Sequence, residues 1–343
     1  WRAGTAAGLA VVPAVGFALA LLNGLFTHLL PPRRLPRLEL KEGVSQAYRT
    51  AVVMPVLLAG GDDLARCLRC LEMNFLNNTD RNLPHVLLGD FADADSASAA
   101  GDDVLLAQAE RCLRALNERY CTAFGWSPFL LLHRQRRWNP CERRWIGWER
   151  KRGKLLEFNR LLTGVGDPGF SHCFGDRRLL DGVRYVLSLD ADTLMPPGAA
   201  RALIGVMAHP LNRAVVVGDR VVAGYGFLQP RLEADPVGAA DTLFAEAFAG
   251  DRTVDLYTHA VSDVYQDLFG EGIYAGKGLY DPQVVARTLS DRLPESAVLS
   301  HDLLEGALSG AGFVSTVTCF EQYPASVLAY LRRLHRWIRG DWQ

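Results

Sequence analysis

The sequence predicts a mixed α/β fold, in which a mostly parallel sheet is flanked by helices and preceded by a transmembrane helix. Apolar strand-like runs alternate with helical patterns, several of these runs end in polar residues, and a long uncharged segment opens the chain. Such alternation is typical of parallel sheets covered by helices on both faces. The 343 residues, 49% hydrophobic and 22% charged, suffice for one large domain or two small ones. We assign residues 1–44 to a membrane helix with a basic connector and residues 45–343 to the α/β domain.

The opening segment, residues 6–30, carries no acidic or basic side chain apart from His28. At about 1.5 Å per residue it is long enough to cross a hydrocarbon core of about 30 Å. A cleaved signal peptide would have a shorter apolar stretch, and a buried core helix is the alternative. Arg33, Arg34 and Arg37 follow immediately. The positive-inside tendency therefore predicts that the α/β domain faces the cytoplasm.

Both ends of the chain suggest a part of a larger membrane protein, because Trp1 stands where an initiator Met would be and no terminating motif precedes Gln343. The seven cysteines are odd in number and scattered, which fits a reducing, cytosol-facing compartment. Cys67 and Cys70 form a C-x-x-C within a helical pattern, so packing is favoured over metal binding. The net charge of -1 gives no basic field, and no nucleic-acid partner is expected.

The first half of the α/β domain divides cleanly into elements. Short apolar runs bounded by polar residues predict buried strands at residues 51–58, 85–89, 129–133 and 185–189. Apolar residues spaced by three and four predict helices at residues 62–76, 102–120 and 153–162. A loop of small residues at 94–101 separates the second strand from the second helix.

The second half is less regular. It predicts a strand at residues 221–227 and helices at residues 239–248, 261–269 and 303–308. Ser300 is the expected cap of the third of these helices, which places Asp302 in its first turn, where the helix dipole favours a carboxylate. Gly276-Lys277-Gly278 is too short for a phosphate-binding P-loop. A last helix is rich in cations and aromatics: Arg332, Arg333, His335, Arg336, Trp337, Arg339 and Trp342.

Carboxylates follow two of the predicted strands. Asp190 and Asp192 come after the fourth strand, and alternation in an extended segment would point both the same way. Two such oxygen ligands suit a divalent cation that also holds phosphate oxygens, although acidic residues after a strand also form ordinary turns. Asp90 and Asp93 follow the second strand. Ligands in parallel sheets lie beyond the carboxyl ends of the strands, so these groups can face one crevice.

Residues 138–154 interleave aromatic side chains with Arg and Lys. Stacking faces combined with cations suit sugars and phosphates. An arm lying against an anionic membrane surface is the alternative, and single-stranded nucleic acid would need a wider basic track.

Together these residues resemble the processive inverting glycosyltransferases, the relatives of cellulose and chitin synthases. The matching residues are Asp90, Asp190 with Asp192, Asp302, and Arg333-x-x-Arg336-Trp337. The longer strings RRWNPCERRWIGWERKRGKLLEFNRLL, VSDVYQDLFGEGIYAGKGLYD, LSHDLLEG and RRLHRWIRGDWQ look like the glycosyltransferase segment of cyclic β-1,2-glucan synthases, which are large enzymes of the bacterial inner membrane. One departure is that His301 precedes Asp302 where cellulose synthases have Glu, and its role is open.

The resemblance implies a glycosyltransferase A-type catalytic domain with UDP-glucose as donor, Mg²⁺ or Mn²⁺ as cofactor and a β-1,2-glucan as acceptor and product. It also implies further transmembrane helices and a carbohydrate-phosphorylase region in the remainder of a larger synthase. The residue roles it implies are a metal site at Asp190 and Asp192; a general base at Asp302; donor contacts at Asp90, Asp93, Lys154, Arg333 and Arg336; and acceptor stacking at Trp337.

Three other readings stay open. Leu187-Ser-Leu-Asp-Ala-Asp-Thr loosely matches the motif of haloacid-dehalogenase-type phosphatases, but Thr193 comes one residue early and no later Asp-Asp pair follows. A domain that only binds glucan or scaffolds a membrane complex is the non-enzymatic alternative. A synthase of β-1,4- or β-1,3-glucan would keep the chemistry and change the linkage.

Overall fold

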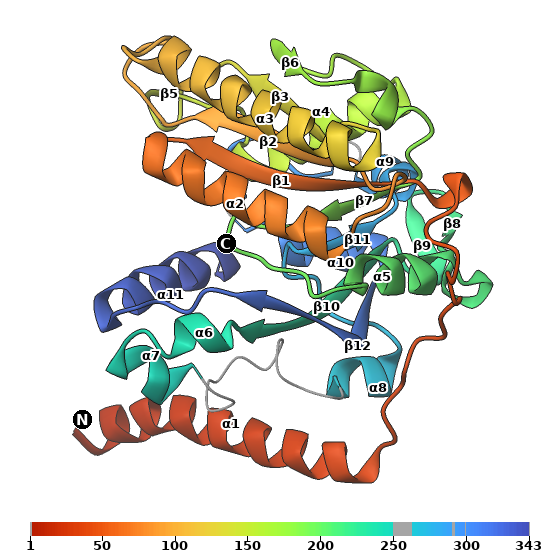
Figure 1. Ribbon diagram of the computed structural model, residues 1–343. Coiled ribbons are helices and arrows are strands. Elements are labelled where there is room, and N and C mark those ends of the chain that lie inside the picture. Colours follow the sequence, from red (N-terminus) through yellow and green to blue (C-terminus); the bar gives the residue numbers. More distant parts are fainter. Residues whose placement is uncertain (1, 250–262, 290–291, 299, 343) are drawn as a thin grey trace.

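The computed structural model describes residues 2–249, 263–289, 292–298 and 300–342. An eight-stranded sheet runs through the α/β domain in the order β12-β10-β11-β7-β1-β2-β3-β6 (Figure 1). Its strands are β1 (Thr50–Leu58), β2 (His85–Phe91), β3 (Phe129–Arg134), β6 (His172–Phe174), β7 (Tyr185–Ser188), β10 (Phe227–Ala234), β11 (Gly278–Tyr280) and β12 (Ala311–Glu321). Strands β7, β1, β2 and β3 are mutually parallel, whereas β6 and β11 run antiparallel to their neighbours. The prediction of a mostly parallel sheet is confirmed.

Side chains of the central strands alternate between two helical layers. On one face, Met54 and Leu87 pack against α2 (Gly61–Asn77) and α3 (Asp102–Phe124), and a neighbouring cluster packs against α5 (Ala199–Ala208). On the other face, Val53 and Val86 pack against α4 (Arg150–Thr163) and α9 (Pro282–Leu289). These residues are fully buried, so the strands read as continuous apolar runs rather than as alternating patterns. The predicted helices on both faces are confirmed.

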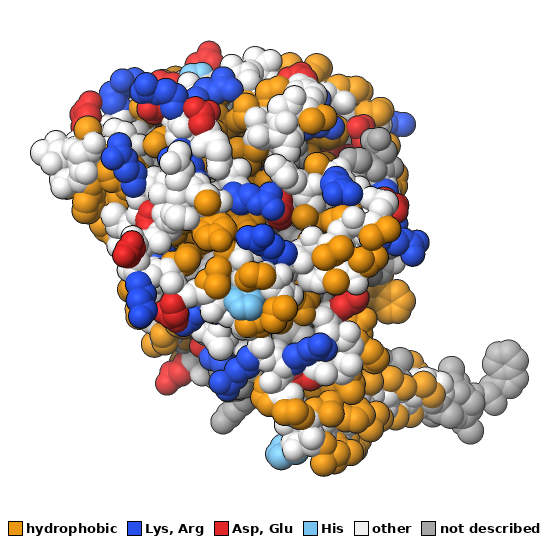
Figure 2. Space-filling view, turned by 90° about the vertical axis from the view of Figure 1, so that its right-hand side faces the viewer, with side chains coloured by type: hydrophobic (Ala, Val, Ile, Leu, Met, Phe, Trp, Pro, Cys, Tyr) orange, Lys and Arg blue, Asp and Glu red, His pale blue; other side chains and the backbone are white. Residues whose placement is uncertain are grey.

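Helix α1 (Arg2–Leu29) stands apart from the sheet at the bottom of Figure 1. Its residues 8–29 have a mean hydropathy of 2.1 and are 0% buried, so this helix is long and apolar enough to cross a membrane. It is not the buried core helix that the sequence left as an alternative. Figure 2 shows its apolar side chains as a protrusion at the lower end of the molecule. Leu9, Phe17 and Leu29 are each at least two-thirds exposed there.

The connector after α1 docks on the α/β domain. The Arg33 amide donates to Asp267 of α8 (Val264–Phe269) over 2.6 Å, and the Leu38 amide donates to the Gly205 carbonyl of α5 over 3.0 Å. Gly205 is required there, because an added Cβ would lie 2.3 Å from the Leu38 carbonyl oxygen. The proposed division at residue 44 stays a prediction.

The second half departs from the predicted elements. The expected strand at residues 221–227 is two strands, since β9 (Arg220–Ala223) pairs with β8 (Val215–Val217) in a hairpin and β10 begins at Phe227. The expected helix at 239–248 is α7 (Leu243–Phe248), preceded by the short α6 (Pro236–Ala239). Of the expected helix at 261–269, residues 261 and 262 lie outside the described residues, and α8 covers the rest. Strand β12 was not predicted.

Ser300 does not cap α10 (Asp302–Ser309); the cap position belongs to His301, and no side chain bonds the free amides. Ser300 instead packs against Gly340 of α11 (Val327–Asp341), where an added Cβ would lie 2.6 Å from the Ser300 Cβ. Helix α11 follows β12 and lies on the side of the sheet toward which the arrows of β10 and β12 point (Figure 1). The start of α10 and the end of α11 are therefore neighbours.

Candidate active site

The loop after β7 carries the two carboxylates of the sequence motif. Strand β7 ends at Ser188, and the chain turns at Asp192 rather than staying extended, with the Thr193 amide donating to the Asp190 carbonyl over 3.1 Å. Leu194 then forms a two-bond bridge with Phe320 of β12, each bond 2.8 Å long. This bridge brings Asp192 beside Glu321, the last residue of β12.

Helix α2 holds that loop in place through side-chain hydrogen bonds. The buried Asn74 side chain donates to the Thr193 carbonyl over 2.9 Å and accepts from the Met195 amide over 2.8 Å. Asn78 makes the same pair of bonds further along, to the Pro196 carbonyl and the Ala200 amide. Cys70 also lies against the Thr193 carbonyl, at 3.4 Å. The loop is thus held by side-chain amides that satisfy its buried backbone groups.

The two cysteines of α2 are part of the packing. Cys67 and Cys70 are buried and free, and burial raises the pKa of the Cys70 thiol to about 12. A thiol held protonated is a poor metal ligand or nucleophile. The packing interpretation of the C-x-x-C is confirmed.

Asp190 is held by two lysines. Lys151 of α4 lies 2.7 Å from one carboxylate oxygen, and Lys277, just before β11, lies 3.2 Å from the other. Burial alone would raise the pKa of Asp190, but the two ammonium groups outweigh it and the pKa is lowered. Asp190 is therefore a carboxylate in the structure.

Asp192 and Glu321 add negative charge beside Asp190. Burial, then the Glu321 and Asp190 carboxylates, raise the pKa of Asp192, against the opposing effect of Lys277. Glu321 lies 2.5 Å from the Lys277 ammonium and 3.5 Å from the Arg333 guanidinium. Asp190, Asp192 and Glu321 thus influence one another electrostatically, but among the described residues the group of three ligand atoms within 4.8 Å of one another is that of His301, Asp302 and Glu305. A divalent cation such as Mg²⁺ or Mn²⁺, which prefers oxygen ligands, would relieve the repulsion that raises the pKa of Asp192.

Lys277 owes its position to the glycines around it. Gly278 has a φ of +153°, and an added Cβ there would lie 2.1 Å from the Leu228 carbonyl oxygen of β10. Gly276 has a φ of +82° and lies against the carboxylate of Asp302. The Gly-Lys-Gly sequence therefore threads Lys277 between β10 and the start of α10 and aims it at Asp190.

Asp302 lies in the same site as Asp190. The Lys151 ammonium that pairs with Asp190 also donates to the Gly276 carbonyl over 2.8 Å. A Cβ on Gly276 would lie 2.5 Å from an Asp302 carboxylate oxygen. Lys151 thus lies between the two acids, and the negative charges of Asp190 and Asp302 together raise the pKa of Lys151 against the effect of burial. Residues 112 positions apart in the chain share one crevice at the carboxyl edge of the sheet.

Asp90 and Lys154 lie deeper than predicted. Asp90 is 1% exposed, and both its oxygens accept from the Arg134 guanidinium over 2.8 Å. Lys154 lies 3.2 Å from Asp90 and donates to the Val56 carbonyl over 2.7 Å. Gly147 lies directly against Asp90, where an added Cβ would lie 2.3 Å from a carboxylate oxygen. Lys154 is therefore not a surface lysine, and these residues form a buried ionic network that joins β2, β3 and α4.

Asp93 is the more accessible acid of this strand end. It follows β2 in a loop and pairs with Arg150 at 3.0 Å, and its side chain is 24% exposed. Arg150 also pairs with Glu142 at 2.6 Å. The aromatic and basic segment at residues 138–154 forms a short hairpin, β4 (Arg137–Asn139) and β5 (Arg144–Ile146), that leads into α4.

Helix α11 brings Arg333, but not Arg336, to the carboxylates. Arg333 reaches Glu321, and its guanidinium lies 4.4 Å from the centre of the Trp337 ring. Trp337 is 39% exposed. Arg336 is exposed, and no ion pair is described for it among the residues that the structure places. The predicted donor contact of Arg336 stays a prediction.

Three residues of the site were missed by sequence reasoning: Lys151, Lys277 and Glu321. Lys151 lies in the basic segment that was singled out, three residues before Lys154 and one helical turn from it. Lys277 lies in the Gly-Lys-Gly that was set aside as a failed P-loop. Glu321 ends a run rich in Val, Thr and Phe, which are residue types enriched in strands. The sequence therefore contained a signal for each of these residues, but only the fold shows that they lie around Asp190.

Comparison with known proteins agrees with the resemblance seen in the sequence. No family model matches the chain. A curated protein described as cyclic beta-(1,2)-glucan synthase NdvB, of Rhizobium meliloti (strain 1021), is 41% identical over 338 residues, which is 98% of this chain. The chain is similar to a segment of a cyclic beta-(1,2)-glucan synthase. The segment spans 12% of the length of that synthase.

This match confirms the resemblance to a segment of a cyclic beta-(1,2)-glucan synthase and supports a part in glucan synthesis. A match to so small a share of the relative also supports a place within a larger synthase. Together with the apolar helix α1, the similarity gives weak support for association with a membrane.

Proposed function

We propose that this chain is the glycosyltransferase A-type segment of a cyclic β-1,2-glucan synthase, which transfers glucose from UDP-glucose to a growing glucan with inversion at the anomeric carbon. The observation that carries the proposal is the meeting of Asp190 and Asp302 across Lys151 in one crevice. Inverting transfer needs charge stabilisation on the leaving nucleotide and a separate base for the acceptor. The similarity to a cyclic beta-(1,2)-glucan synthase supports the product class.

The donor diphosphate would bind at Asp190 and Asp192. A Mg²⁺ or Mn²⁺ ion held there would act as a Lewis acid that stabilises negative charge on the departing UDP. Lys277, and Arg333 behind Glu321, add cationic groups around the same carboxylates. Asp93 is the more accessible candidate for a uridine contact. Asp90 and Lys154 are buried beneath the crevice and support it in this conformation. Arg336 would reach the diphosphate only after its side chain turns inward.

The acceptor would enter opposite the nucleotide. UDP-glucose carries glucose in the α configuration, so a β product requires one in-line displacement. The bond between C1 and the UDP oxygen breaks as the acceptor 2-hydroxyl forms a new bond to C1. Asp302 takes the hydroxyl proton, and UDP leaves with the electron pair. Trp337 would stack on an acceptor glucose, because the C–H face of a sugar packs on an indole.

The setting of the reaction follows from α1 and the basic connector. We propose that α1 spans the bacterial inner membrane and that the α/β domain faces the cytoplasm, where UDP-glucose is available. Further membrane helices and a phosphorylase region of the same synthase would be its partners. A β-glucan of another linkage stays the alternative product. A phosphatase is disfavoured, because β1, β2 and β3 precede Asp190 in the chain, whereas the haloacid-dehalogenase-type fold places the matching motif on its first strand.

The proposal is tested by measuring UDP release from UDP-glucose by the full synthase, with and without EDTA. Asp302→Asn should keep UDP affinity and lose roughly 10²- to 10⁴-fold in turnover, the usual effect of a positioned base. Asp192→Ala should lose the metal-dependent part of UDP binding measured by calorimetry. Asp176→Asn, which changes an exposed ion pair away from the crevice, is the control. Near-normal turnover by Asp302→Asn, or unchanged affinity of Asp192→Ala with Mn²⁺, would contradict the assignment.

A further inference from the structure

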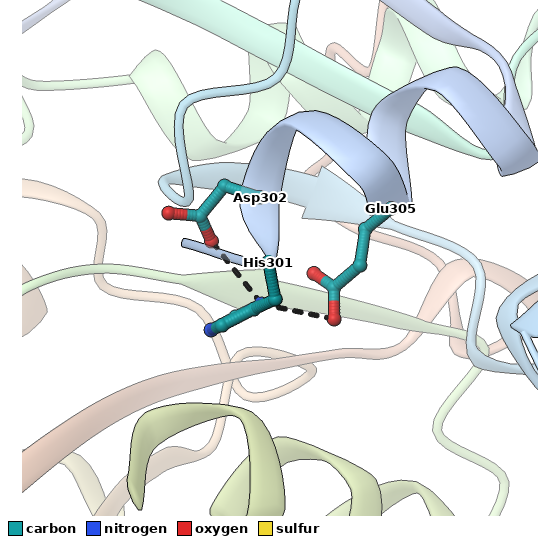
Figure 3. A group of neighbouring side chains, drawn as sticks. All are labelled: His301, Asp302 and Glu305. Atoms are coloured by element: carbon teal, nitrogen blue, oxygen red, sulfur yellow. Dashed lines mark ion pairs between the residues drawn. The ribbon is translucent and has the colours of Figure 1, made fainter. Parts of the chain in front are cut away.

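His301, Asp302 and Glu305 form a cluster at the start of α10 (Figure 3). Figure 3 shows ion pairs from one histidine nitrogen to both acids. The His301 Nδ1 lies 3.0 Å from the Glu305 carboxylate and 3.4 Å from the Asp302 carboxylate. His301 and Glu305 are four residues apart on a helix, so they lie on the same face one turn apart. One imidazole nitrogen thus bridges two acids.

The three side chains differ in depth. His301 and Glu305 are each 8% exposed, whereas Asp302 is 26% exposed. Asp302 is therefore the member that reaches the crevice, with the other two behind it. Gly276 closes its other side, since an added Cβ would lie 2.5 Å from the Asp302 carboxylate. The Asp302 carboxylate is therefore confined between the His301 imidazole and the backbone of Gly276.

The surroundings favour a charged imidazole. Burial by itself would lower the pKa of His301, but the Glu305 and Asp302 carboxylates outweigh it and raise the pKa, against the opposing charge of Lys151 from α4. Two phenols face the cluster from other elements, Tyr274 in the loop before β11 and Tyr280 in β11. Burial, followed by the cluster carboxylates, raises the pKa of both phenols, so they stay neutral.

We propose that His301, held by Glu305, is a positioning residue that fixes the orientation of Asp302 toward the acceptor. This inference rests on the proposed role of Asp302 as general base. Asp190, Asp192 and Glu321 surround the crevice with negative charge, and a donor diphosphate adds more, so these groups repel the Asp302 carboxylate. The His301 imidazolium, 3.4 Å from that carboxylate, attracts it and holds it in place against the repulsion.

Glu305 has a separate part in the arrangement. It supplies the carboxylate closer to the His301 Nδ1 and so maintains the positive charge of the imidazole within a buried site. The charge on His301 is present at low pH and is lost as the pH rises through its raised pKa. Loss of the Glu305 charge would move that transition to lower pH. The two residues therefore control the alkaline limb of the pH profile of transfer together.

The inference is tested by the pH dependence of glucosyl transfer in the full synthase. His301→Gln should lower kcat roughly 10-fold, because a misplaced base takes the proton less efficiently, and it should remove the alkaline limb that His301 sets. His301→Lys keeps a cation beside Glu305 and should keep most of kcat. Glu305→Gln should move the alkaline limb to lower pH. UDP affinity should change in none of them, and Glu118→Gln on the exposed face of α3 is the control.

Equal losses of kcat in His301→Gln and His301→Lys, with the alkaline limb unmoved in Glu305→Gln, would reduce His301 to a packing role and overturn the inference. If both His301 variants fold poorly and lose UDP binding, the alkaline limb of Glu305→Gln decides the question. One ligand atom from each of the three side chains lies within 4.8 Å of the others, close enough to hold a metal ion. If elemental analysis showed that these variants lose a bound metal ion, the cluster would be a metal site and the inference would also be overturned. The Asp302→Asn variant separates this inference from the proposed function. If that variant kept full activity, Asp302 would not be the base, and the proposed function itself would fail.

Discussion

At the scale of single residues, the crevice balances acids against lysines. Lys277 contacts Asp190 and Glu321 at once, and these acids raise its pKa further above its ordinary value despite burial. A cation bound at Asp190 would compete with Lys277 for the same carboxylate. A displaced lysine would then be within reach of the phosphate oxygens that accompany the ion. We therefore expect Lys277 to contact an anionic ligand, because a neutral nucleoside carries no phosphate oxygen for the ammonium group to bind.

Lys277→Met should weaken UDP binding by roughly 10- to 100-fold, because hydrogen bonds to charged groups contribute about 1.5–3 kcal/mol each. Uridine, which lacks phosphates, should bind the variant as well as it binds the unaltered protein. Lys277→Arg keeps the charge and should lose much less. Calorimetric titrations of UDP and uridine measure both affinities. An equal loss for the two ligands would show that Lys277 supports the fold of the crevice and does not contact phosphate.

At the scale of elements, α2 determines where the acids of the β7 loop lie. Asn74 satisfies a buried carbonyl and a buried amide of that loop, on either side of Leu194. Asn74→Ala would leave the Met195 amide without its partner and the Thr193 carbonyl with only the weak Cys70 thiol donor, at a cost of about 2–4 kcal/mol in the free energy of unfolding. Asn77→Ala on the same helix is the matched control, because it removes one bond, to the Met195 carbonyl at a partly buried site. Urea titrations measure both, and a smaller loss in Asn74→Ala than in Asn77→Ala would contradict this role of Asn74.

The elements also show how far the sequence could lead. The strands β1, β2, β3 and β7 were predicted within a few residues, because each is a short apolar run that stays buried on both faces. Strand β12 escaped prediction although it is rich in Val and Thr, which favour strands. It pairs with β10, some 80 residues away in sequence, across a register shift. No local pattern encodes such a pairing.

The same limit applies to the site. Asp190, Asp192 and Asp302 could be proposed from spacing and resemblance, and the fold brings Asp190 and Asp302 into one crevice. The depth of Asp90 and Lys154 could not be proposed, since it depends on Arg134 approaching from β3 and on the missing side chain of Gly147. Burial of an ion pair is a property of packing. The sequence shows only that the charges exist.

At the scale of the whole molecule, two buried histidines make stability depend on pH. Burial lowers the pKa of His85 to about 4, against a hydrogen bond to the Leu83 carbonyl. Burial also lowers the pKa of His133 to about 4, with Asp90 opposing the shift. Both are neutral in the folded state, whereas the unfolded chain binds protons on them below about pH 6.5. Stability should therefore fall as the pH drops from about 6.5 toward 4 and level off below that.

The pKa of each histidine is lowered by about 2.5 on folding. Each therefore changes the free energy of unfolding by on the order of 3 kcal/mol across that pH range. The free energy of unfolding, measured by urea titration in detergent between about pH 7 and pH 4, should show this slope. His133→Gln removes one titrating group, so its slope should be about half as steep even if its stability at neutral pH is lower. His335→Gln, at an exposed position on α11, should keep the full slope. A slope unchanged by His133→Gln would mean that His133 binds protons equally in the folded and unfolded states. Asp190 does not contribute to this slope, because its pKa is lowered in the folded state, so the stability that it provides is lost only as the pH falls below about 4.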